Sequence, residues 1–328
     1  MLLRMILMLR QFVVAAAATT ALSALTGCSA FSDSSATDDG RLTVVAGLYP
    51  LQWVAQQVAG DHVQVEDLTQ PGQEPHDLEL SPKETGDVAA ADLVVYEKGL
   101  QAAVDQAVKQ TAGGTALDVG PVAGLEPLDH GGHDDVTHHP GQTQDEEAEE
   151  SAKDLGDLDP HFWQDPLKLA KVGDAVAEAL AKIDAPHATA YHANAEALRT
   201  KLEKLDHEYA AGLAHCQRDV IVVSHNAFGY LWRYGIDVEP IAGLSPDAEP
   251  TPADLGRLQQ LIKKDGITTV FGERLVPASL SKTLADDAGV TTAVLDPIEG
   301  LTDATTDDDY LSLMRDNLAA LTKANGCQ

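Results

Sequence analysis

The feature that most constrains this chain is one long stretch with a single apolar stripe, residues 187–214. Its apolar residues recur every three or four positions, which predicts one helix with one buried face. Pro186 is well placed before this helix because the first helical turn needs no N–H. A helix over this range would be roughly 42 Å long, enough to traverse a domain. We interpret it as a helix that joins two lobes; a helix packed inside one large domain is the alternative. The stripe comprises Tyr191, Ala195, Leu198, Leu202, Leu205, Tyr209 and Leu213.

Short apolar runs alternate with helical patterns on both sides of this helix. Such alternation is typical of parallel α/β sheets. We therefore expect an α/β fold with two four-stranded parallel lobes, residues 41–186 and 215–328, joined by the rigid helix. Ligands should bind between the lobes, beyond the carboxyl ends of the strands. The expected strands are 42–48, 63–68, 93–97, 116–119, 220–223, 238–241, 268–271 and 291–295, and the expected helices include 82–90, 100–110, 227–234, 252–264, 278–288 and 307–324.

The first 27 residues have the pattern of an export signal. Two arginines precede an uncharged, mostly apolar stretch at 12–24, which is too short for an ordinary transmembrane helix. The sequence Leu25-Thr26-Gly27-Cys28 then resembles the bacterial lipobox, whose cysteine is lipidated and becomes the mature N-terminus. Residues 28–40 are small, polar and acidic, as expected of a flexible tether. We expect a protein anchored by lipid to the outer face of a bacterial cytoplasmic membrane.

The charge of the chain narrows its possible partners. Lys and Arg number 22 against 52 Asp and Glu, a net charge of −30. This balance argues against nucleic-acid binding and against a basic membrane-binding patch. The acidity could attract cations, but solvation of an exported protein is the favoured general explanation.

Two cysteines remain in the mature chain, Cys216 and Cys327. In an oxidising compartment one disulfide between them is the natural assignment. Two free thiols, or a Cys–His metal site without any Cys-x-x-Cys spacing, are the alternatives. The bridge would close a loop of more than 100 residues, for which chain entropy gives up to about 5 kcal/mol.

Three histidines stand at the ends of expected elements, each flanked by turn residues. His76 follows the second strand, His161 precedes a helix that starts near Asp165, and His225 directly follows the strand 220–223. A single histidine in such a place usually makes a hydrogen bond or a cap. Because three histidines occur in such places, we hypothesise that they contribute to one common binding site.

A carboxylate could complete this set. Asp296 follows the last strand, and its alternative role is to cap the turn into Pro297. Three imidazoles and one carboxylate fill the tetrahedral shell that Zn²⁺ prefers. Four protein ligands leave no open coordination position, which favours storage or transport over catalysis.

Residues 129–150 lack periodic apolar positions and are expected to form a disordered loop. As a functional element, this loop would gather zinc weakly and pass it inward, or report zinc abundance. The alternative is a solvated acidic insertion without a role. Residues 129–150 contain four of the twelve histidines of the chain, His130, His133, His138 and His139.

Four stretches resemble, in order, the zinc-binding branch of the metal-specific solute-binding lipoproteins of bacterial ABC transporters. They are PHDLELSPK at 75–83, DPHFWQDP at 159–166, VSHNAFGYL at 223–231 and LDPIEG at 295–300. Together they cover nearly the whole mature chain. The resemblance implies two α/β lobes linked by one rigid helix, with small closure movements rather than wide hinge bending.

The resemblance also implies the metal ligands, which are His76, His161, His225 and Asp296. Manganese and iron members typically carry a Glu where His225 stands, so this His favours zinc, as imidazole preference does. Zinc members carry a His- and acid-rich loop where 129–150 lies. In some of them a Glu just before the first His competes as the fourth ligand. Here Pro75 separates Glu74 from His76, so Asp296 or a water is expected instead.

The expected function is therefore that of a monomeric receptor that presents Zn²⁺ to a membrane permease powered by an ATPase. A manganese or iron receptor of the same family and a metal-dependent surface adhesin are the alternatives. A His₃ zinc site with a water could also be catalytic. The sequence contains no HExxH, GxSxG or P-loop motif that would support an enzyme.

Overall fold

The computed structural model describes residues 40–111, 115–128 and 155–328. Backbone contacts divide the chain into Met1–Arg41 and Leu42–Gln328, and the fold described below is that of the second part. Within the described ranges, no helix combines the length and apolar character needed to cross a membrane. The expected export signal, Cys28 and the His-rich segment 129–150 lie outside the described residues.

The N-terminal sheet has four parallel strands in the order β2-β1-β3-β4. Alternate residues of β1 pack in two apolar layers, one on each face of the sheet, because successive side chains of a strand point to opposite faces. Val44 and Ala46 pack in the core that contains α2, while Val45 packs with α3 and α4. The elements are β1 (Leu42–Ala46), β2 (Val63–Asp67), β3 (Leu93–Tyr96), β4 (Thr115–Asp118), α2 (Tyr49–Ala59), α3 (Pro82–Ala90), α4 (Ala102–Thr111) and α5 (Gly120–Ala123).

The C-terminal sheet repeats this plan with the strand order β10-β9-β7-β8, again all parallel. Ile221 and Val223 of β7 face the main core, and Val222 packs with α9 and α10 on the other side. The elements are β7 (Val220–Val223), β8 (Asp237–Pro240), β9 (Thr269–Gly272), β10 (Thr291–Val294), the 3₁₀ helix η4 (Gly229–Tyr234), α9 (Pro252–Asp265), α10 (Ser279–Ala288) and α11 (Tyr310–Asn325).

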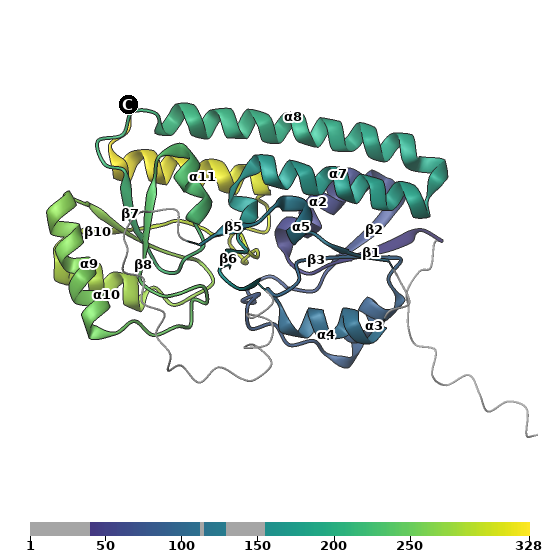
Figure 1. The fold of residues 1–328 in the computed structure, drawn as a ribbon, viewed down its shortest axis with the longest axis horizontal. Helices are drawn as coiled ribbons and strands as arrows, with labels where there is room; N and C mark the ends of the chain where they lie inside the picture. The colour runs from purple at the N-terminus through teal and green to yellow at the C-terminus, as the bar shows by residue number, and fades with distance from the viewer. Residues whose placement is uncertain (1–39, 112–114, 129–154) are drawn as a thin grey trace, which may run out of the picture. The chain divides into compact units, whose positions relative to one another are not determined.

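Helix α8 (Ala188–Leu213) connects the two sheets and runs beside α7 (Pro166–Ile183), as Figure 1 shows. It buries every residue of the predicted stripe. A Cβ at Gly173 of α7 would lie 3.0 Å from Leu198 Cδ2, so glycine allows the two helices to approach closely. One continuous apolar core includes residues of both sheets together with α2, α7, α8 and α11. The two lobes therefore share a core along α8.

The prediction of two four-stranded parallel α/β lobes joined by one long helix is confirmed. Two details differ. The helix expected at 227–234 is the shorter 3₁₀ helix η4. A short antiparallel pair, β5 (Glu126–Pro127) with β6 (Leu158–Asp159), was not predicted because two-residue strands carry no periodic signal.

The expected disulfide between Cys216 and Cys327 is present, across a sequence separation of 111 residues. It ties the segment that follows α8 to the end of α11. The backbone N–H groups of Gln217 and Arg218 also donate to the Asn325 carbonyl, so the same two segments are joined by hydrogen bonds.

Replacing both cysteines, Cys216→Ser with Cys327→Ser, should lower the free energy of unfolding by about 3–5 kcal/mol. The reason is that the bridge restricts a long loop in the unfolded chain. Denaturant unfolding of the oxidised protein and of the variant measures the difference. A reductant should destabilise the parent protein and leave the variant unchanged. A difference below about 1 kcal/mol would contradict this account.

Candidate metal centre

The three histidines singled out in the sequence lie in three different connections of the fold. His76 is in the loop between β2 and α3, His161 lies between β6 and the 3₁₀ helix η2 (Phe162–Gln164), and His225 is two residues beyond β7. Gln101, just before α4, supports the first of these loops, because its Nε2 donates to the carbonyl of Pro75. Segments from both lobes thus supply the histidines.

The structure brings the three rings together. Their centroids are 5.6 Å apart for His76 and His161, 6.0 Å for His76 and His225, and 5.5 Å for His161 and His225. Glu299 Oε1 lies 3.5, 3.2 and 3.3 Å from the Nε2 atoms of His76, His161 and His225. One potential ligand atom from each of the four residues lies within 4.8 Å of all the others.

The site is buried, and its central atoms have no hydrogen-bond partners. The side chains of His161 and His225 are fully buried, that of Glu299 is 1% exposed and that of His76 is 12% exposed. None of the three Nε2 atoms, and neither oxygen of Glu299, makes a hydrogen bond. Buried polar atoms are normally paired because leaving them unpaired is costly. Four groups that point lone pairs at one another fit a cation placed between them.

Two carboxylates outside this cluster orient two of the rings. Asp159 Oδ1 lies 2.8 Å from His161 Nδ1, and Glu273 Oε1 lies 2.6 Å from His225 Nδ1. A carboxylate only accepts, so each Nδ1 donates, and the Nε2 of each neutral ring is left as a ligand atom. Asp159 also requires Gly229 beside it, since a Cβ there would overlap its carboxylate.

Glu299 occupies the position that the sequence analysis assigned to Asp296, and this assignment is corrected. Asp296 Oδ2 pairs with Arg274 Nε at 2.9 Å, and its Oδ1 accepts from the N–H of Ile298. Ile298 has a φ of 61° and is the only non-glycine residue with positive φ among the described residues. Asp296 therefore shapes the turn, and the turn carries Glu299 into the cluster. Asn317 of α11 braces the turn through the backbone N–H and carbonyl of Asp296.

Glu74, considered as a competing ligand, is not one of the four grouped residues. Its Oε1 accepts from the N–H of His76 at 3.2 Å, so it supports the loop that carries this histidine. Burial, with Glu299 nearby, raises the pKa of Glu74 to about 8. The four histidines expected to act as auxiliary ligands, His130, His133, His138 and His139, lie outside the described residues.

Strong electrostatic coupling marks the cluster. Burial alone would lower the pKa of His225, but Glu299 and Glu273 raise it to about 10. Burial would raise the pKa of Glu299, and the three neighbouring imidazoles instead hold it well below its usual value. Burial lowers the pKa of His76. Protonated His225 and the ionised Glu299 carboxylate thus stabilise each other across the cluster.

Hydrogen bonds between the lobes hold the two halves of the site in register. The indole Nε1 of Trp163 donates to the carbonyl of Pro297 at 2.7 Å, and Gln164 Nε2 donates to the same carbonyl. The hydroxyl of Tyr310 donates to the carbonyl of Trp163 at 2.5 Å. These bonds join the segment of His161 directly to the turn that carries Glu299.

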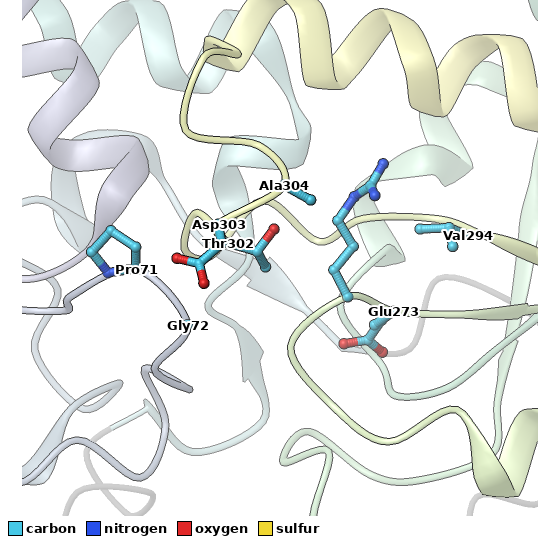
Figure 2. A pocket seen from close by; sticks show the side chains of 8 residues that line it. Pro71, Gly72, Glu273, Val294, Thr302, Asp303 and Ala304 are labelled. Atoms are coloured by element: carbon cyan, nitrogen blue, oxygen red, sulfur yellow. The ribbon is translucent and has the colours of Figure 1, made fainter.

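A hollow of about 490 Å³ lies beside the cluster. Figure 2 shows Pro71 and Gly72 on one side of it, Glu273 and Val294 on the other, and Thr302 between them. Glu273 lines this hollow and also accepts from His225. The hollow therefore extends to a residue that directly contacts one of the histidines.

Comparison with known proteins agrees with this geometry. Residues 44–324 match the family described as zinc-uptake complex component A, periplasmic. The chain is 34% identical over 295 residues to the zinc-binding lipoprotein AdcA of Streptococcus pneumoniae, covering 86% of this chain and 56% of that protein. It thus spans about half the length of these curated relatives. The high-affinity zinc uptake system protein ZnuA of Bacillus subtilis is 30% identical, with 86% of each chain covered.

A solved structure shows the same fold. The Zn(II)-bound ZnuA-like domain of Streptococcus pneumoniae AdcA superposes with a TM-score of 0.69 at 31% identity, covering 87% of this chain and 99% of that one. The chain therefore belongs to the zinc-uptake complex component A family, a family of solute-binding proteins and not of enzymes.

Proposed function

We propose that this chain is a zinc receptor that binds one Zn²⁺ between its lobes and delivers it to an ABC importer. The ligands are His76 Nε2, His161 Nε2, His225 Nε2 and a carboxylate oxygen of Glu299. The observation that carries the proposal is the convergence of four ligand atoms that are buried and have no hydrogen-bond partner, namely the Nε2 atoms of the three histidines and a carboxylate oxygen of Glu299.

The donor set favours zinc over manganese or iron. Three imidazole nitrogens and one carboxylate oxygen suit a tetrahedral zinc site with bonds of about 2.0–2.2 Å. Manganese prefers more oxygen ligands and a larger coordination number. A Zn²⁺ ion and one carboxylate give a first shell of charge about +1, and the carboxylates of Asp159 and Glu273 lie directly behind two of the imidazoles to balance it.

Delivery requires a position outside the membrane next to a permease. Export through residues 1–27, lipidation at Cys28 and a tether at 28–40 would supply this position. The receptor would act as a monomer, with lobes at 41–186 and 215–328, and would pass zinc to a permease coupled to an ATPase. The His-rich loop 129–150 would gather zinc weakly and pass it inward.

His225→Ala should weaken zinc binding by more than about 100-fold, since even partners of metal ligands cost 10–100-fold when removed. Competition titration against a chelator of known zinc affinity measures the change. His207→Ala, which removes an exposed histidine from α8, is the matched control and should keep the parent affinity. Parent-like zinc binding by His225→Ala would refute the site.

Glu299→Gln should weaken zinc binding about 10-fold or more, because the neutral amide removes the negative charge of the first shell. Asp296→Asn is the control, since Asn can still accept from Ile298 while the pair with Arg274 is lost. It should change zinc affinity far less. A larger loss of zinc affinity in Asp296→Asn than in Glu299→Gln would indicate that Asp296, and not Glu299, is the fourth ligand.

Zinc binding should release at least one proton at pH 7. His225, with a pKa of about 10, is protonated in the metal-free protein and must lose this proton to bind zinc through Nε2. Apparent affinity should therefore fall as the pH decreases, by up to about tenfold per pH unit for one proton. Calorimetry in buffers of different ionisation enthalpy counts the protons, and a count of zero would contradict the assignment of His225.

A further inference from the structure

Two exposed histidines lie on the surface, where α2 ends and α8 begins. His62 is the last residue of the 3₁₀ helix η1 (Gly60–His62), and His187 is the last residue of η3 (Ala185–His187) and the N-cap of α8. Their rings are stacked, with centroids 4.1 Å apart and an interplanar angle of 20°. Both side chains are exposed, that of His187 by 45%.

A carboxylate fixes the orientation of one of these rings. Asp184 Oδ2 lies 2.7 Å from His187 Nδ1 and accepts a hydrogen bond of 2.5 Å from the hydroxyl of Tyr191. Tyr191 belongs to the buried stripe of α8, so its hydroxyl is a firm anchor. Because Asp184 only accepts, Nδ1 of His187 carries the proton, and Nε2 of the neutral ring keeps its lone pair.

The position of His62 is also set by the fold. Gly60 ends α2 with a φ of 57° and turns the chain towards β2. Asn194 of α8 donates from Nδ2 to the Val58 carbonyl at 2.9 Å. The end of α2 is therefore tied to α8 about two helical turns from His187, and His62 lies beside His187.

The pattern at His187 repeats that of the buried centre. There, Asp159 and Glu273 bind the Nδ1 atoms of His161 and His225 and leave each Nε2 for a metal. Asp184 does the same for His187. A carboxylate behind an imidazole orients the ring and increases its basicity as a ligand. A second imidazole stands within ring-stacking distance.

We propose that His62 and His187 form a second, peripheral site for a divalent cation of the zinc class. Nε2 of His187 and one ring nitrogen of His62 supply two ligands, and water completes the shell. Binding through both rings requires the exposed His62 ring to rotate about its side-chain bonds out of the stack, so that one of its nitrogens faces the ion. With two protein ligands in place of four, this site binds more weakly than the buried centre. The net charge of −30 raises the local concentration of cations.

The test uses the full chain with His130, His133, His138 and His139 replaced by Ser, so that these residues contribute no weak binding. After the first equivalent of zinc has bound, a second equivalent should titrate at micromolar to submillimolar concentration. His187→Ala and His62→Ala should each abolish it. Asp184→Asn should weaken it about 10–100-fold. His192→Ala, an exposed histidine on the same helix, should leave it unchanged.

Two readouts separate this site from the buried centre and from misfolding. Circular dichroism and the first equivalent of zinc should be the same in all these variants. Long-range ¹H–¹⁵N spectra of the imidazoles should show the second equivalent shifting Nε2 of His187 and one nitrogen of His62. A second equivalent that survives in either alanine variant, or spectra in which zinc leaves either ring unshifted, would overturn the proposal.

Discussion

The shared apolar core along α8 is the constraint on which the metal centre depends. His76 and His161 come before this helix in the chain, and His225 and Glu299 come after it. The centre requires the ligand atoms of these four residues to lie within a few ångströms of one another. A metal cannot supply this alignment in the free receptor. One core that includes both sheets, α7, α8 and α11 supplies it instead, and the hydrogen bonds to the Pro297 carbonyl refine it. The alignment precedes binding, so less free energy is lost on ordering when the ion arrives.

This alignment has a cost that the core must offset. Three imidazole nitrogens and two carboxylate oxygens are buried without hydrogen bonds, and each such group costs on the order of 1–3 kcal/mol. The attraction between protonated His225 and the Glu299 carboxylate offsets part of this cost. A divalent cation relieves more, because all four groups then bind it directly. The unpaired buried atoms would thus favour binding of a cation by these four groups.

One local device recurs in the molecule, namely a carboxylate bound to the Nδ1 atom of a histidine. At His161 and His225 the surroundings are buried, and His76 and Glu299 lie close enough to complete a set of four ligand atoms. At His187 the same pair is exposed and stands beside one other imidazole. The difference in burial and ligand number would make the proposed site at His62 and His187 weaker than the buried one, although the chemistry of the individual pair is the same.

The sequence by itself determined the features that depend on local pattern. The stripe of α8, the eight strands and the three histidines at element ends follow from side-chain periodicity and from turn residues, and the structure places them within two residues of expectation.

The sequence did not distinguish Asp296 from Glu299, since both lie in one short turn after the last strand. The positive φ of Ile298, the pair of Asp296 with Arg274 and the bracing by Asn317 decide which carboxylate enters the cluster. The stack of His62 on His187 is likewise a tertiary result, because those residues lie 125 positions apart (187 − 62) and meet only where α2 packs on α8. Contacts between distant segments carry no periodic signal in a sequence, and only the packed core brings them together.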